Sequence, residues 1–183
     1  MPPIAANKMT AEQERAAAAF TAGRGIAVLG PFAVMLRSPE VMLRAMAMGD
    51  YLRFRNVLPK RVSEMVILLT AREWSQQFEW SHHHPLAMHA GLAAGVAEAI
   101  GDGRRPEKLS TDEAVAYDFS MELQHFRRVS DATYARAVGA FGEQGVIDLI
   151  GIVGYYSLLA MMMNVARTKP DADAGEPLQR FPE

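Results

Sequence analysis

The chain has 183 residues, of which 50% are apolar and 22% are charged, a composition typical of one ordinary soluble domain. Its formal net charge of −2 gives no electrostatic footprint for nucleic acid or an anionic membrane, so we expect neither partner. The absence of cysteine excludes disulfides, thiolate nucleophiles, Cys-ligated zinc and iron–sulfur clusters.

The first helix is predicted from Thr10, which has the position of an N-cap before an Ala-rich segment that stops near Gly23 or Gly25. No signal peptide is expected over residues 1–20, because charged side chains interrupt them, so we expect a cytoplasmic protein. The glycines of residues 23–30 do not fit the dinucleotide-binding fingerprint and predict a loop.

The next two helices are each marked by a proline. Ser38 followed by Pro39 predicts an N-cap and a first helical residue, and the helix that follows has an apolar stripe. This stripe comprises Val41, Met42, Ala45, Met48 and Leu52. Pro59 predicts the start of another helix, with Glu64 displaced from the centre of its inward face. That inward face comprises Val62, Met65, Val66, Leu69 and Thr70.

The middle of the chain predicts two helical hairpins. Ser75 is expected to cap the helix that follows it, and Pro85 is expected to kink that helix. A polar Gly/Pro loop covers residues 100–109, and Ser110 with Glu113 then forms a capping-box pattern.

The last predicted helix is apolar and free of charge over the 18 residues from Leu149 to Ala166. Ser130 starts a helix before it. Asp148 at its edge, Asn164 inside it and the lack of a basic flank favour a buried helix of a core or subunit interface over a membrane span. No useful β-alternation occurs, so the fold class is all-α with seven or eight helices.

The candidate site lies between Glu64 and His89, a stretch that holds four of the five histidines. Gln76, Glu79 and His83 are spaced i, i+3 and i+7, so they share one helical face. An antiparallel return of the chain can bring Glu64 to the same pocket, with one glutamate ionised and the other protonated by burial.

Simpler interpretations stay open for each of these residues. His83 is either a general acid/base or a histidine satisfied by a local hydrogen bond. The two glutamates either pair with it or form surface salt bridges to Arg61 or Arg72.

The other candidates are weaker. His82, His83 and His84 are consecutive and point about 100° apart, so they cannot converge on one ion, although a zinc or nickel site between subunits at His84 or His89 stays open. Trp80 either walls the pocket or belongs to the core with Trp74. Three polar side chains of the last helix pack in the core or, as the alternative, form the polar far side of the pocket: Tyr155, Tyr156 and Asn164.

The run from Arg61 to Leu92, with Glu64, Gln76, Glu79 and His83, resembles the core motif of the carboxymuconolactone decarboxylase family, which includes the alkyl hydroperoxidase D proteins. In the peroxidase branch two cysteines occupy the positions of Gln76 and Glu79, so this chain is similar to the cysteine-free members. The similarity covers residues 35–169. It leaves residues 1–34 as an N-terminal helix and linker, and residues 170–183 as an extended tail.

The resemblance implies an alkyl hydroperoxidase D-like helical bundle that forms a homo-oligomer, either a trimer or a hexamer. It also implies a cofactor-independent lyase without a metal, acting on a small carboxylated lactone or related acid. In that interpretation His83, Glu79 and Glu64 are catalytic, while Gln76 and Trp80 bind the substrate. The alternative is a non-catalytic helical oligomer that binds a small ligand. Thiol peroxidase activity is excluded by the absence of cysteine.

Overall fold

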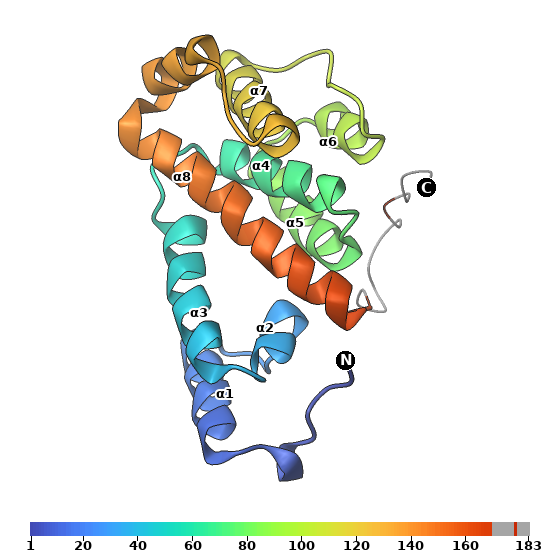
Figure 1. Cartoon of the computed structure of the whole chain (residues 1–183). Coiled ribbons are helices and arrows are strands. Elements are labelled where there is room, and N and C mark those ends of the chain that lie inside the picture. Colours follow the sequence, from blue (N-terminus) through green and yellow to red (C-terminus); the bar gives the residue numbers. More distant parts are fainter. Residues whose placement is uncertain (170–177, 179–183) are drawn as a thin grey trace.

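The computed structural model describes residues 1–169 and Leu178, and all regular elements in that part of the chain are helical (Figure 1). Eight α-helices follow a short 3-10 helix, η1, and this confirms the predicted all-α class. Their bounds are η1 (Ala6–Lys8), α1 (Ala11–Arg24), α2 (Gly30–Met35), α3 (Pro39–Phe54), α4 (Lys60–Glu73), α5 (Gln77–His89), α6 (Ala94–Gly101), α7 (Thr111–Phe126) and α8 (Asp131–Ala166). The predicted tail from residue 170 lies outside the described residues, apart from Leu178.

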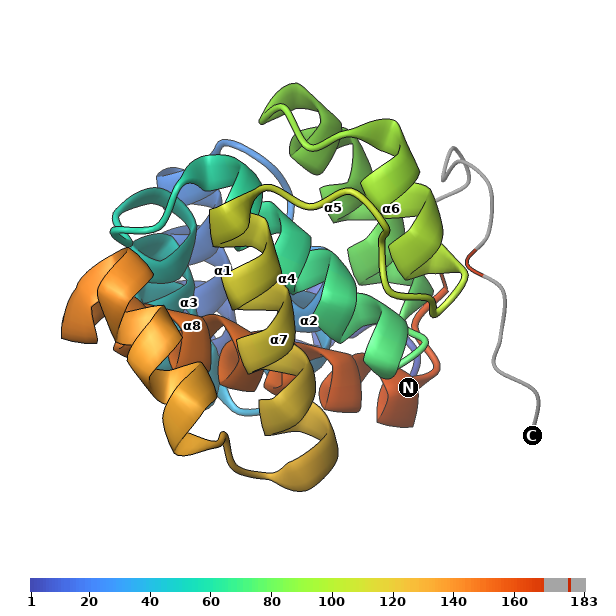
Figure 2. The same cartoon turned by 90° about the horizontal axis from the view of Figure 1, so that it is seen from above.

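Helix α4 is the centre of the molecule. It packs against α5, α6, α7 and α8, and α7 and α6 can be seen beside it in Figure 2. Every residue from Val62 to Arg72 is buried, so α4 is covered on all sides rather than on one inward face. Glu64, which was predicted to lie away from the centre of that face, is therefore buried as well: its side chain has no exposed surface.

Helix α8 crosses the molecule diagonally and packs against α2, α3, α4 and α7 (Figure 1). It has a break at Gly142, where φ is 68° and ψ is 174°, and this break separates the two helices that were predicted. Among the described residues it is the one helix long and apolar enough to span a membrane, a test that a core helix also passes. In its most apolar window, 56% of the residues are buried inside the protein.

Helices α2 and α3 pack on the opposite side of α8, and α1 packs against α3 (Figure 1). Thr10 caps α1 in a reciprocal capping box with Gln13, and α1 ends at Gly25 with a φ of 68°, as predicted. The predicted loop over residues 23–30 ends earlier than expected, because α2 begins at Gly30. Its six residues are too few to show a helical period in the sequence, although three of them are buried.

Three predicted details of the helices were wrong. Ser38 precedes α3 but makes no capping bond with its side chain, and two members of the α3 stripe, Val41 and Met48, are 42% and 46% exposed. Ser75 has a φ of 46° and does not cap α5; the side chain of Gln76 accepts a bond from the backbone N–H of Phe78 instead.

Pro85 does not interrupt α5, which continues through it to His89 without a non-helical residue. The carbonyl of Ser81 is the one that loses its helical donor at Pro85. The Ser81 hydroxyl donates to the carbonyls of Gln77 and Phe78 at 2.7 and 3.3 Å.

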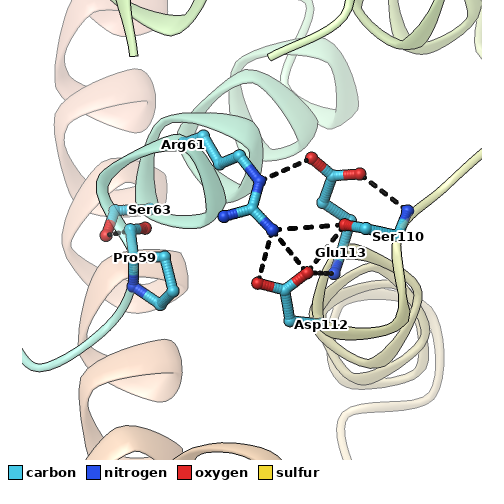
Figure 3. Close-up of polar contacts among 6 residues, drawn as sticks. All are labelled: Pro59, Arg61, Ser63, Ser110, Asp112 and Glu113. Atoms are coloured by element: carbon cyan, nitrogen blue, oxygen red, sulfur yellow. Dashed lines mark hydrogen bonds and ion pairs between the residues drawn. The ribbon is translucent and has the colours of Figure 1, made fainter. Parts of the chain in front are cut away.

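Polar contacts join α4 to α7. The guanidinium of Arg61 donates to both carboxylate oxygens of Asp112 at 2.6 Å and to Glu113 at 3.1 Å, as Figure 3 shows. Glu113 also completes the predicted capping box with Ser110 at the start of α7. Arg61 is thereby occupied by the first turn of α7, and it does not form the surface salt bridge to Glu64 that we considered.

Helix α3 approaches α8 closely at Gly49. A Cβ atom built on Gly49 would lie 2.3 Å from the hydroxyl oxygen of Tyr155, which is itself buried. Since real Cβ atoms do not come so near another heavy atom, only glycine permits this spacing without a shift.

We predict that Gly49→Ala lowers the free energy of unfolding by about 1–3 kcal/mol, because Tyr155 or α3 must move. Gly139→Ala is the matched control: nothing lies within 4 Å of its Cβ position, and alanine in an exposed helix stabilises by up to about 1 kcal/mol. Urea unfolding of both variants measures the difference. Equal stability of the two variants would contradict the close approach.

Candidate active site

The site is built on a buried carboxylate, Glu64 of α4, which pairs with Lys60 of the same helix and is hydrogen-bonded to His83 of α5. The Nδ1 atom of His83 lies 2.7 Å from Oε2 of Glu64, and Nζ of Lys60 lies 2.7 Å from Oε1 of the same carboxylate. Glu64 is 0% and His83 4% exposed, whereas half of the Lys60 side chain reaches solvent. The antiparallel return predicted from the sequence therefore brings Glu64 and His83 together.

Burial and pairing act in opposite directions on the pKa of Glu64. Burial raises the pKa, but the hydrogen bonds and charges of His83 and Lys60 outweigh it and lower the pKa to about 2. Glu64 is therefore a carboxylate at neutral pH.

For His83, burial is the larger effect. It lowers the pKa to about 4, although the neighbouring Glu64 carboxylate raises it. The imidazole is therefore neutral at pH 7, and its proton lies on Nδ1, which donates to Glu64. Nδ1 carries the one hydrogen bond that His83 makes within the described chain, so Nε2 keeps its lone pair for a ligand.

Glu79 has the opposite protonation state. It is 3% exposed, and neither of its carboxyl oxygens has a hydrogen-bond partner among the described residues. Burial raises its pKa well above the ordinary value, so Glu79 stays protonated. This agrees with the prediction of one ionised and one protonated glutamate. The direct pairing of Glu79 with His83 that its i, i+4 spacing allowed is not formed.

A pocket with about 70 Å³ of room for water-sized molecules lies between the N-terminal helices, α5 and α8. His83 and Glu79 both line it, together with Arg24 and Arg53. Its other walls are aromatic, aliphatic and phenolic: Phe20, Ile26, Leu29, Pro31, Phe32, Phe78, His82, Tyr155, Tyr156 and Leu159. Walls of this kind exclude water and strengthen the electrostatic effect of the few polar groups they surround.

The two residues predicted to bind substrate lie elsewhere. Gln76 is buried, donates to Asn164 at 2.7 Å and caps α5. Trp80 packs against Gly101 of α6. Neither of them lines the pocket, and neither does Asn164. Tyr155 and Tyr156 do line it, as the alternative interpretation of those residues proposed.

Arg24 and Arg53 are the pocket residues that the sequence did not indicate. Arg24 comes from the end of α1 and pairs with Asp50 at 2.7 Å, while Arg53 comes from the last turn of α3. No spacing rule links either arginine to His83, because each reaches the pocket through tertiary packing alone.

No group of three or more potential metal ligands gathers anywhere in residues 1–169. His82 and His84 instead make ring contacts, with Phe78 and Trp80 at centroid distances of 6.2 and 5.7 Å. The metal site considered between subunits at His84 or His89 stays a prediction.

No protein-family model and no curated protein sequence matches this chain. Solved structures do match. An alkylhydroperoxidase AhpD core protein of Ralstonia eutropha, an uncharacterised peroxidase-related protein, superimposes with a TM-score of 0.74 at 14% identity, over 94% of this chain and 92% of that chain. The debrominase Bmp8 in complex with 2,3,4-tribromopyrrole gives 0.70 at 10% identity, over 93% and 90%.

A third structure, a protein of unknown function from Agrobacterium tumefaciens, gives a TM-score of 0.66 at 13% identity, over 76% of this chain and 96% of that chain. At such identities the likeness concerns the fold. The chain therefore has an AhpD-like all-α fold, in agreement with the expectation from its core motif.

The protonation of Glu79 should appear in the pH dependence of stability. Its pKa is higher in the folded than in the unfolded chain, so folding retains a proton that the unfolded chain releases above about pH 4.5. The free energy of unfolding should therefore fall as pH rises above 4.5, by up to about 1.4 kcal/mol per pH unit from this group.

We predict that Glu79→Gln removes this contribution, so that the variant gains stability relative to the unaltered protein as pH rises from 5 to 8. Glu98→Gln, on an exposed face of α6, is the control and should leave the pH dependence unchanged. Chemical denaturation at several pH values measures the free energy of unfolding of each variant. Parallel stability curves for Glu79→Gln and the unaltered protein would show that Glu79 ionises in the fold.

Proposed function

We propose that the protein is a cofactor-independent lyase similar to carboxymuconolactone decarboxylase, which transfers protons at carbon in a small carboxylated lactone or related acid. One observation carries this proposal: a neutral, Glu64-oriented His83 and a protonated Glu79 line the same pocket. Such chemistry needs a base that is deprotonated and an acid that is protonated at the same pH, and different environments give the two groups these states.

The proposed roles follow from those protonation states. His83 accepts a proton at Nε2, while Glu64 holds the ring through Nδ1 and stabilises the imidazolium that forms. Glu79, which carries a proton at neutral pH, delivers it to the substrate.

Loss of carbon dioxide is the reaction of this class that we expect. The bond between the carboxylate carbon and its neighbour breaks, and the electron pair passes into a conjugated carbonyl to form an enolate. Glu79 then donates its proton to the enolate carbon, a new C–H bond forms, and solvent restores the proton of Glu79. His83 serves as the base where a substrate must first lose a proton. An apolar pocket favours this sequence because negative charge becomes more dispersed as the reaction proceeds.

The chemistry of a thiol peroxidase does not fit this chain. Such an enzyme attacks peroxide with a thiolate, and the sequence contains no cysteine. Gln76 and Glu79 occupy the positions that correspond to the two cysteines of the peroxidase branch. Gln76 is committed to capping α5, so the proposed chemistry rests on Glu79 and His83 instead.

We also propose that the protein forms a homo-oligomer. A line of apolar side chains at helical spacing on α8 is exposed in the single chain, with Ile147, Ile150, Met161 and Val165 between 42% and 71% exposed. Covering these residues with a second copy removes apolar surface from water, and this supports the expected trimer or hexamer.

We predict that His83→Ala and His83→Gln each lower kcat by about 100-fold or more on substrates that must first lose a proton at carbon, because the proton acceptor is lost. The exposed His89 provides the matched control, His89→Gln, which should keep full activity. Turnover of a panel of carboxylated lactones and unsaturated acids in D₂O, followed by NMR, reports both carbon dioxide loss and deuterium incorporation at carbon. Size-exclusion chromatography verifies that the assembly is intact. Full turnover by either His83 variant would refute the assignment.

The pH profile gives a separate prediction. His83 acts as a base only when deprotonated, so kcat/KM should fall with decreasing pH through an apparent pKa of about 4. An ordinary histidine would produce that decline near 6.5. A decline centred near 6.5, in a protein that circular dichroism shows to be folded there, would contradict a buried neutral His83.

A further inference from the structure

The charges around the pocket do not balance. Lys60 pairs with Glu64, Arg24 pairs with Asp50, and Glu79 is neutral. Arg53 remains: it forms no ion pair with any carboxylate of the described residues, and its Nε is buried without a hydrogen-bond partner. A half-buried guanidinium that lacks a counter-charge is energetically unfavourable unless a ligand supplies one.

The position of Arg53 directs this charge into the pocket. Arg53 lines the pocket beside His83 and lies near enough to lower the pKa of the imidazole. Its nearest ring contact, with Phe54 at 5.1 Å, involves a side chain that is 68% exposed. Because no carboxylate of the described residues pairs with it, the guanidinium can bind an anion that enters the pocket, in the bidentate geometry that suits a carboxylate.

A second unsatisfied donor faces the same space. Tyr156 is 2% exposed, its hydroxyl has no hydrogen-bond partner in the described chain, and its ring meets that of His83 edge-on at 5.0 Å. Burial raises its pKa well above the ordinary value, so the hydroxyl keeps its proton and can donate. Buried donors without partners are rare in proteins and indicate an absent ligand or water.

The size of the pocket limits the ligand. Its room of about 70 Å³ is roughly half of the 150 Å³ of an engineered cavity that holds benzene. The enclosed part of the ligand must therefore be smaller than a benzene ring. The rings of Phe20, Phe32 and Phe78 in the walls favour a flat, conjugated skeleton over a branched one.

We infer that the pocket takes a short, planar monocarboxylate, whose carboxylate binds the guanidinium of Arg53 and whose remaining acceptor atom receives a bond from the hydroxyl of Tyr156. This inference rests on the proposed function in that it concerns the same pocket, and it adds the substrate class and the residue that recognises its charge. Arg53 supplies the one positive charge at the pocket that the described residues leave unpaired, so the ligand carries a single negative charge.

The test compares two probes of the same shape, trans-crotonate and its neutral amide, crotonamide, in NMR titrations of the full chain. Crotonate should bind at least about 10-fold more tightly, because a charge-assisted bond to Arg53 is absent in the amide. The Nε–H signal of Arg53 should shift on adding crotonate. Equal affinity for the two probes would overturn the inference.

Two variants assign the charge recognition. Arg53→Met should weaken crotonate binding to the level of crotonamide, whereas Arg55→Met, an exposed neighbour that does not line the pocket, should bind both probes normally. Retention of the crotonate preference by Arg53→Met would overturn the inference. If that variant does not fold, Arg53→Lys decides: weaker crotonate binding with unchanged crotonamide binding supports the inference, and unchanged crotonate binding refutes it.

These binding measurements are independent of turnover. Arg53-dependent binding in a protein that turns over no acid would support this inference and refute the proposed function. Turnover that requires His83, in a protein that binds crotonate no better than crotonamide, would support the proposed function and refute this inference.

Discussion

The structure depends on one buried carboxylate. Glu64 has no exposed surface and lies in a helix that is covered on all sides, so its charge must be compensated inside the protein. Lys60 provides the compensating charge from one turn earlier in α4, and His83 provides a hydrogen bond from α5. Removing either partner would leave a buried charge only partly compensated. The packing of α5 against α4 and the orientation of the imidazole are therefore set by the same interaction.

This arrangement explains why His83 differs from the other histidines of α5. Its Nδ1 is occupied by Glu64, so the tautomer is determined and Nε2 is left for chemistry. The low pKa of His83 and the high pKa of Glu79 share one cause, burial, which favours the neutral form of each. One pocket thus holds a neutral imidazole and a protonated carboxyl group, the two groups on which the proposed chemistry rests. Arg53 adds the charge that would draw an organic acid to them.

Those parts of the site that obey a local rule could be predicted from the sequence. Helical spacing placed Glu79 and His83 together, and an antiparallel hairpin added Glu64. The spacing rule failed at Gln76. Its φ of −92° and ψ of 100° are not helical, so its side chain does not lie on the helical face that the spacing predicted. Arg53 and Arg24 could not be found, because contacts between helices distant in sequence bring them to the pocket. The helices were predictable for a similar reason, because their starts and breaks depend on a few neighbouring residues. The burial of α4 on all sides was not predictable, because it depends on helices that are distant in the sequence.

Glycine has opposite consequences at two positions of α8. Gly139 is helical and exposed, and any larger residue with good helix propensity suits it. Gly142, three residues later, has a φ of 68° with a ψ of 174°, a conformation essentially restricted to glycine. A side chain there would favour one straight rod in place of two segments meeting at an angle. A redesigned sequence with strong helix formers throughout this segment would therefore straighten α8 at Gly142, where the chain changes direction to cross the core.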